Sequence, residues 1–361
     1  MINKMKKILT QLLTLTAFCL LSAHTFAGEG ESIALDPATG NYVITHYRDS
    51  EDTFEKLIFI PATKIKPTIK NEFKSDQDGI IHYGYKLTSG RDSQQVIRRI
   101  LFNPVSSVTS SLPNIPLNAP AGQVASDMMD VASHFETPAP WQAVMGYSDS
   151  MASFRIGWYY KSRTGGKSKP LGLAPGDKAS FGFNSRDLPG IILANVAGYA
   201  PDSATIDGEE LPDSPGTDLF WQQYFALSQN DFLRRPAAVP AIAVAKPFNA
   251  ATLLGSIQTQ MHTWIGMQLL DATFSSQLDL YLTAAADAYS HIQPKVVKED
   301  LEKVRVMLKR EYQDIDRDDD KEDVKSVDKT KHIMIDRLAA RVLDFDLQYV
   351  LKRMNKDHDS D

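Results

Sequence analysis

The spacing of apolar residues changes partway along the chain, and this change limits the folds that the chain can adopt. Around residues 178–184, Ala179, Phe181 and Phe183 alternate with polar or small residues, which is the period-two pattern of a half-buried strand. Beyond residue 254, apolar residues instead recur at steps of three and four, as on the buried face of an amphipathic helix. We therefore predict the α+β class, with strands and helices in separate segments.

Short apolar segments bounded by turn residues recur before residue 201 and predict strands. These segments are residues 32–35, 42–47, 57–60, 81–87, 96–102, 154–160, 179–183 and 191–196. We expect hairpins to join 81–87 to 96–102 and 179–183 to 191–196. No helical run of the length needed for a βαβ crossover separates the strands. Their regular spacing predicts an N-terminal immunoglobulin-like antiparallel β-sandwich over residues 28–201, and no motif identifies a family.

The rest of the chain predicts helices. Apolar residues at helical spacing form four groups: Leu254, Ile257, Met261 and Trp264; Phe274, Leu278, Tyr281, Ala285 and Ile292; Leu301, Val304, Leu308 and Tyr312; Ile335, Leu338, Val342, Phe345 and Tyr349. Short connections between the groups favour a C-terminal antiparallel helical bundle over residues 251–361. Residues 202–250 include three prolines between positions 234 and 247, and we predict a proline-rich connector there.

The first 27 residues have the pattern of a secretory signal peptide. Lys4, Lys6 and Lys7 precede an apolar run over residues 8–21, and this run is too short for a spanning helix. Thr25 and Ala27 supply the small residues of a cleavage site. We therefore predict a signal peptide over residues 1–27 and an exported protein, either periplasmic or secreted.

The single cysteine, Cys19, lies inside the apolar run of this signal. A lipoprotein-type signal needs a small residue before its cysteine, and Phe18 stands there instead. The mature chain would then contain no cysteine, so we expect neither disulfides nor thiolate metal sites. No second apolar span follows, so we expect no integral membrane span after signal cleavage.

A net charge of −6 disfavours nucleic acid and anionic membranes as partners. Nucleic acid and anionic membranes attract proteins through a strongly basic surface. We therefore expect no nucleic-acid partner.

An acidic run supplies the one candidate for a metal site. Asp314, Asp316, Asp318 and Asp320 place oxygen ligands at alternating positions, as a calcium loop does. The turn glycine and the final bidentate acid of such a loop are replaced by Asp319 and Lys325. A solvated loop between helices is the favoured interpretation, and weak calcium binding remains open. No other cofactor is predicted.

No catalytic motif is found. The histidines are scattered, with no His-x-His pair and no His-Glu-x-x-His helix. Residues 146–150 resemble a nucleophile elbow, but Ser150 stands where the second glycine is required. We therefore assign no catalytic residue.

Three consecutive aromatic residues are the candidate binding residues. On a strand, Tyr159 points away from the face that carries Trp158 and Tyr160. Core packing accounts for the Trp158 face, while Tyr159 could offer a flat ring to a sugar or peptide.

We therefore expect a non-enzymatic binding or interaction protein of the bacterial envelope or secreted fraction, with a protein or glycan partner. The expected contact regions are the segment 103–140 and the junction of sandwich and bundle. One alternative is a hydrolase of envelope polymers whose site assembles only in three dimensions. Another is a structural protein that self-associates through its helices.

Overall fold

The computed structural model describes residues 30–48, 52–106, 135–148, 153–161, 172–199, 219–311 and 334–358. The chain divides into two compact units. The first contains Met1–Lys64 and Gly198–Phe232, and the second contains Ile65–Ala197 and Leu233–Asp361. The first unit is therefore built from two separate stretches of chain. This division differs from the predicted boundaries at residues 28–201, 202–250 and 251–361.

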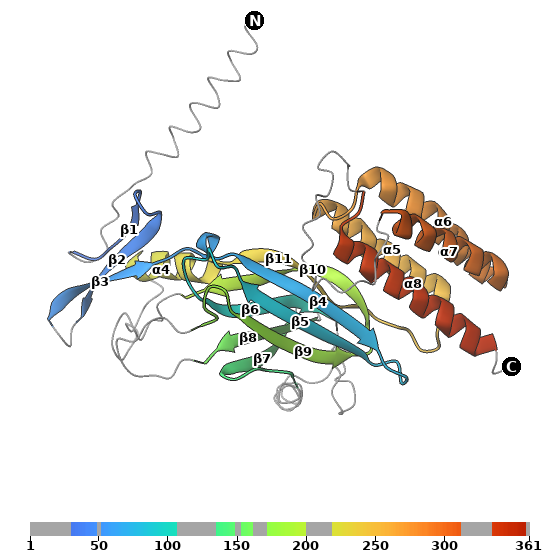
Figure 1. Cartoon of the computed structure of the whole chain (residues 1–361), viewed down its shortest axis with the longest axis horizontal. Coiled ribbons are helices and arrows are strands. Elements are labelled where there is room, and N and C mark those ends of the chain that lie inside the picture. The colour runs from blue at the N-terminus through green and yellow to red at the C-terminus, as the bar shows by residue number, and fades with distance from the viewer. Residues whose placement is uncertain are drawn as a thin grey trace, which may run out of the picture. The chain divides into compact units, whose positions relative to one another are not determined.

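The first unit consists of a small sheet covered by one helix. Strands β1 (Ser32–Asp36), β2 (Asn41–Arg48) and β3 (Thr53–Phe59) pair antiparallel in that order (Figure 1). The helix α4 (Leu219–Asn230) places Phe220, Trp221 and Tyr224 in one buried cluster with Ile44 and Phe59. The predicted strands 32–35, 42–47 and 57–60 thus form a sheet of their own.

The second unit contains two further sheets. Strands β4 (Pro67–Ser75), β5 (Ile81–Ser89) and β9 (Lys178–Ser185) form one sheet in the order β4-β5-β9. The other sheet has the order β11-β10-β6-β8-β7, from β6 (Ile97–Val105), β7 (Trp141–Ser148), β8 (Ser153–Tyr160), β10 (Leu188–Gly198) and β11 (Leu233–Ile242). Antiparallel pairing joins β4 to β5, β5 to β9, β6 to β8, β7 to β8 and β10 to β11.

Aromatic side chains fill the space between these two sheets. The ring centroid of Tyr85 on β5 lies 4.4 Å from that of Phe102 on β6. Trp158 on β8 is fully buried, and its ring lies 5.1 Å from Phe181 on β9. The indole Nε1 donates a hydrogen bond to Thr137 Oγ1 at 3.0 Å. Because each strand alternates its side chains between faces, the period-two aromatic pattern places these rings in the core.

Both predicted hairpins of the second unit are wrong. Strand β5 pairs with β4 and β9, while β6 belongs to the other sheet. Strands β9 and β10 are likewise in different sheets, although Arg186 and Asp187 alone separate them. A turn can carry the chain across to a facing sheet as well as back along the same one. Both edges of β5 are occupied by other strands, so the returning segment pairs elsewhere.

The predicted connector at residues 202–250 instead contains α4 and β11. Prolines are compatible with β11 because it is the edge strand of its sheet. At Ala238 of β11, the backbone amide and carbonyl both form hydrogen bonds with side chains of the facing sheet. The Ala238 amide donates to Asn71 Oδ1 at 3.0 Å, and the Ala238 carbonyl accepts from the Tyr85 hydroxyl at 2.8 Å. Proline spacing therefore marks an edge strand here and not a linker.

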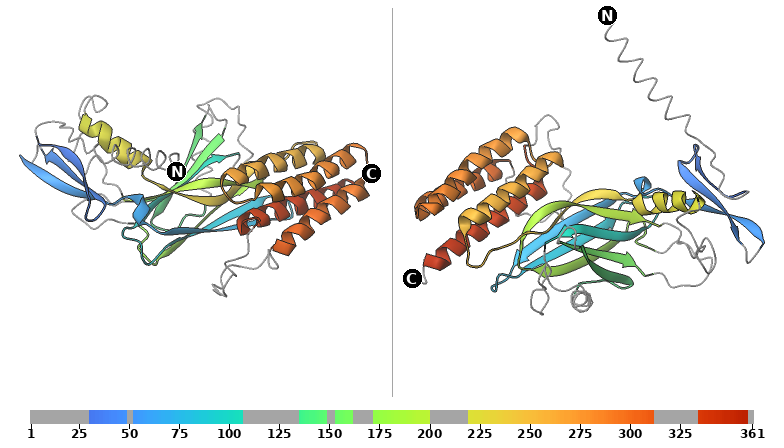
Figure 2. Two further views of the ribbon diagram at one scale, coloured as in Figure 1. Left: turned by 90° about the horizontal axis from the view of Figure 1, so that it is seen from above. Right: turned by 180° about the vertical axis from the view of Figure 1, so that it is seen from behind.

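Four helices follow β11: α5 (Ala250–Gly266), α6 (Ala272–Ser290), α7 (Pro294–Glu311) and α8 (Arg337–His358). Figure 2 shows them side by side. Three of them begin at a capping side chain: Asn249 accepts from the Thr252 amide, Asp271 from the amides of Thr273 and Phe274, and Asp336 from the Leu338 amide. Most of the predicted apolar positions are buried, including Leu254, Ile257, Met261 and Trp264 on α5.

The α+β class is confirmed, since antiparallel sheets occur together with five helices, α4 to α8, in the C-terminal part of the chain. Within the described ranges, no helix combines the length and apolar character needed to cross a membrane.

Replacing Trp158 with alanine should destabilise the second unit, because the indole is fully buried between the sheets. We expect the free energy of unfolding to fall by about 3–5 kcal/mol, measured by chemical denaturation. Tyr159→Ala is the matched control, because this neighbouring ring is only half-buried. A loss of similar size in both variants would contradict the assignment of Trp158 to the core.

Candidate functional site

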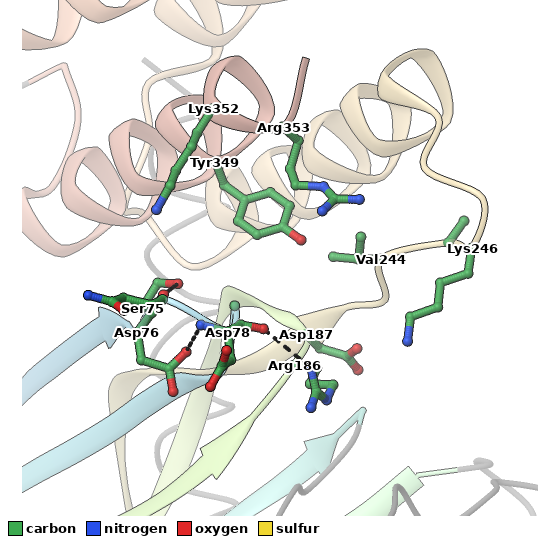
Figure 3. Close-up of a pocket in the computed structure, with 13 residues that line it drawn as sticks. Ser75, Asp76, Asp78, Arg186, Asp187, Val244, Lys246, Tyr349, Lys352 and Arg353 are labelled. Carbon is green, nitrogen blue, oxygen red and sulfur yellow. Dashed lines mark hydrogen bonds between the residues drawn. The ribbon is translucent and has the colours of Figure 1, made fainter. Parts of the chain in front are cut away.

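A cavity of about 200 Å³ opens where four segments of the second unit meet (Figure 3). The first segment is the β4–β5 turn at residues 75–79, and the second is the β9–β10 turn at residues 186–187. The third is the β11–α5 connection at residues 244–246. The C-terminal half of α8 supplies the fourth with Tyr349, Lys352 and Arg353.

The β4–β5 turn holds two carboxylates at the cavity. Asp76 Oδ1 accepts hydrogen bonds from the amides of Asp78 at 2.9 Å and Ile80 at 2.8 Å. Gly79 adopts a φ of 76°, which glycine tolerates without steric cost. This Asx-type turn fixes the backbone, so Asp76 and Asp78 both face the cavity from a defined position.

A buried tyrosine fixes the β9–β10 turn. The Tyr83 hydroxyl donates to the Asp187 carbonyl at 2.8 Å. The Ser106 hydroxyl donates to Asp187 Oδ2 at 2.6 Å. Arg186 Nη1 lies 3.4 Å from the Asp78 carbonyl, which links this turn to the β4–β5 turn. The two turns therefore form one connected wall of the cavity.

The opposite wall is one face of α8. Tyr349, Lys352 and Arg353 lie three and four residues apart, so they project from the same side of the helix (Figure 3). The Arg353 guanidinium carbon lies 5.3 Å from the ring centroid of Phe248, within the range of a cation–π interaction. Arg353 Nε is buried, and no hydrogen-bond partner for it occurs in the part of the chain that the structure describes.

The cavity is lined by charges of both signs. Its cations are Arg186, Lys246, Lys352 and Arg353, and its anions are Asp76, Asp78 and Asp187. Within the described residues, Lys246, Lys352 and Arg353 form no ion pair. These side chains can therefore give directional hydrogen bonds and charge to a bound molecule.

The phenol of Tyr349 stays neutral at the cavity. Burial raises the pKa of Tyr349 above its ordinary value, against the opposing effects of Arg353 and Arg186. A neutral phenol both donates and accepts hydrogen bonds. Tyr349 therefore adds a polar contact without adding a charge.

One turn before Tyr349, α8 carries a buried carboxyl group. Asp346 is 0% exposed, and neither of its oxygens has a hydrogen-bond partner among the described residues. Burial raises the pKa of Asp346 well above its ordinary value. The same carboxyl helps to raise the pKa of Tyr83, although burial of Tyr83 is the larger cause. Asp346 does not line the cavity.

The structure separates the three predicted binding residues from this cavity. The predicted binding residue Trp158 is fully buried, so its ring offers no surface to a ligand. Side chains alternate between the two faces of β8, and Trp158 lies on the face that packs in the core. Tyr159 and Tyr160 are half-buried, and the Tyr160 ring packs edge-on against Trp141 with centroids 5.5 Å apart. Neither tyrosine lines the cavity.

The predicted calcium residues Asp314, Asp316, Asp318 and Asp320 lie outside the described residues. In the part of the chain that the structure describes, no group of three or more histidine, cysteine or acidic side chains is placed to hold a metal ion.

The cavity residues were missed because each fits an ordinary local pattern. The sequence Asp-Gln-Asp-Gly at residues 76–79 is a turn signal. Helical spacing predicts that Tyr349 lies on the apolar face of a helix, and the proline spacing predicts that Lys246 lies in a connector. One available signal was the pair Lys352 and Arg353, which follows Tyr349 on the same helical face.

Replacing Asp346 with asparagine should stabilise the protein at neutral pH, because the variant cannot carry the buried charge. A folded-state pKa raised above the unfolded value means that the wild type loses stability as pH rises above about 4. We expect the variant to exceed the wild type by about 1–3 kcal/mol in free energy of unfolding at pH 7. Denaturation over a pH series should show this gap closing toward about pH 4.

Asp344→Asn provides the control on the same helix. Asp344 is also buried, but its Oδ1 accepts from Arg305 Nε at 2.7 Å. Its replacement should therefore destabilise the protein at pH 7. Stabilisation by Asp344→Asn, or destabilisation by Asp346→Asn at every pH, would contradict this account of the two carboxyls.

The chain matches no protein-family model, and no curated protein resembles it. Among solved structures, it is similar to an uncharacterized protein from Nocardia farcinica whose crystal structure is described as revealing an immunoglobulin-like fold. The similarity covers 36% of this chain and 79% of that chain, at 11% sequence identity and a TM-score of 0.23. Neither the fold nor the function of this chain is inferred from a likeness at this level.

Proposed function

We propose that this chain is an exported, non-enzymatic binding protein whose ligand site is the cavity between α8 and the two turns. The observation that supports this most directly is the set of cations on the cavity lining. Lys246, Lys352 and Arg353 face it without an ion-pair partner among the described residues. Charged groups that converge on a concave surface are typical of ligand sites.

Binding fits the carboxylates of the cavity better than hydrolysis does. The Asp76 carboxylate already accepts two backbone hydrogen bonds, and Asp187 accepts one from Ser106. A hydrolase that uses paired carboxylates needs one with a raised pKa beside the substrate. Among the described carboxyls, burial raises the pKa of Asp231 and of Asp346, and neither residue lines the cavity. The hydrolase alternative therefore has no supporting observation here.

The size of the cavity limits its ligand. Sites for drug-sized molecules usually have volumes of about 300–1,000 Å³, and this cavity measures about 200 Å³. A protein or glycan partner would have to insert a small terminal group. We propose export to the periplasm or the cell exterior on the basis of residues 1–27, whose composition is that of a signal peptide.

We also propose a finer description of the fold that places this site. The facing sheets with aromatic rings between them are consistent with an immunoglobulin-like sandwich. The succession of α5, α6 and α7 with short connections is consistent with an antiparallel bundle. The site would then lie at the junction of sandwich and bundle.

Weak calcium binding by Asp314, Asp316, Asp318 and Asp320 is a separate proposal. Calorimetry with excess calcium should give a small heat of binding that is lost when all four are replaced by asparagine. Absence of heat from the wild type would remove the proposal.

Nuclear magnetic resonance can test the binding function. The ¹⁵N-labelled protein is titrated with inorganic phosphate, D-glucuronate and the twenty free L-amino acids. We expect at least one probe to give saturable shifts of backbone amides at residues 75–79, 186–187, 244–246 and 349–353. Lys352→Gln should weaken that binding by about tenfold, because a charge-assisted hydrogen bond is lost.

Lys298→Gln is the matched control, because Lys298 is an exposed lysine on α7 that does not line the cavity. It should leave the titration unchanged. If no probe shifts the cavity amides, or if the shifts map to another surface, the cavity is not the binding site.

A further inference from the structure

We propose that the cavity binds a small zwitterion, of the class of a free α-amino acid or a dipeptide. This inference rests on the proposed binding function. It adds the charge pattern of the ligand, which follows from how the charges are divided between the two walls of the cavity.

The two walls differ in net charge (Figure 3): the charged lining residues of α8 are both cations, whereas the two turns carry three carboxylates and one cation, Arg186. Lys352 and Arg353 project from α8 on one side, and Asp76 and Asp78 lie across the cavity on the β4–β5 turn. A simple anion would gain from α8 but would meet two carboxylates. A simple cation would be attracted by the two carboxylates but repelled by Lys352 and Arg353 on α8. A ligand that carries an ammonium and a carboxylate is complementary to both walls at once.

The hydrogen-bonding capacity of the acidic wall suits an ammonium. Asp76 Oδ1 accepts from two backbone amides, and no described residue donates a hydrogen bond to Oδ2, which keeps its acceptor capacity. The Asp78 carboxylate accepts no hydrogen bond from the described residues. An ammonium has three donors, which two carboxylates can share.

The α8 wall suits a carboxylate. Lys352 supplies a mobile ammonium, and Arg353 supplies a planar guanidinium that matches a carboxylate in shape. The Arg353 guanidinium is held over the Phe248 ring, so less side-chain freedom is lost on binding. The neutral Tyr349 hydroxyl can donate a further hydrogen bond.

Two further features limit the ligand to a small molecule. The volume of about 200 Å³ is below that of sites for drug-sized molecules. Val244 and Ala245 also line the cavity, and they offer apolar contact to a short side chain. A small amino acid or a short peptide satisfies the charge, size and apolar requirements together.

The competing explanation is structural. The charges of α8 and of the β4–β5 turn could attract one another across the cavity and hold the helix in place, with no ligand required. Under that explanation, charge-removing variants change only the stability of the protein. Under the zwitterion proposal, they change which chemical groups of a ligand are recognised.

The test compares the tightest-binding amino acid or glycyl-L-valine with its N-acetylated and C-amidated analogues, by calorimetry and by shifts of the cavity amides. Each cap removes one charge and should weaken binding to the wild type by about tenfold or more. Asp76→Asn keeps the Oδ1 acceptor for the turn amides and removes only the charge. This variant should bind the N-acetylated and free forms more nearly equally.

Lys352→Gln should instead reduce the preference for the free carboxylate over the amide, while Lys298→Gln should alter neither preference. Circular dichroism confirms that each variant is folded.

If phosphate or glucuronate shifts the cavity amides and neither amino acids nor the dipeptide do, the zwitterion inference is wrong and the binding function stands. If no probe shifts them, both proposals fail. Variants that change stability but not ligand preference would favour the structural explanation.

Discussion

The hydrogen bond from the Tyr83 hydroxyl to the Asp187 carbonyl connects the core to the candidate site. Tyr83 is fully buried, and its ring stacks on Phe183 with centroids 5.7 Å apart. A buried tyrosine hydroxyl requires a partner, and this one is the backbone of the β9–β10 turn. The aromatic packing between the sheets therefore fixes the positions of Arg186 and Asp187 in this turn. A change in that packing would reach the cavity without any change in its lining.

Local patterns predicted the kinds of secondary structure well, because each depends on spacing along one segment. The aromatic alternation at Phe181 and Phe183 and the helical spacing from Leu254 to Trp264 both correspond to elements of the structure. The pairing of strands could not be predicted in the same way. The turn residues at 186–187 are compatible both with a hairpin and with a crossing between sheets, and the choice depends on which edges distant strands already occupy.

The candidate site was less predictable than the fold, because its residues come from four segments that are distant in sequence. Asp76 belongs to a turn and Tyr349 to a helical face, and neither sequence pattern predicts that the two residues line the same cavity. Asp346 is a sharper case. It occupies a fully buried position on α8, with no hydrogen-bond partner in the described ranges, whereas a sequence pattern predicts that an aspartate lies on the solvated face. Trp158 differs in the opposite direction: it is a candidate binding residue in the sequence, but its side chain is fully buried in the core.

The discontinuity of the first unit has a consequence for the order in which the protein can be completed. The Asp231 carboxylate accepts from the Ala62 amide at 2.7 Å across 169 residues of sequence. During synthesis, β1 to β3 emerge early, but α4, which covers Ile44 and Phe59, emerges only after the strands up to β10. The first-made sheet therefore keeps its apolar face uncovered throughout the synthesis of the strands from β4 to β10, which is the condition under which nascent chains aggregate or recruit chaperones.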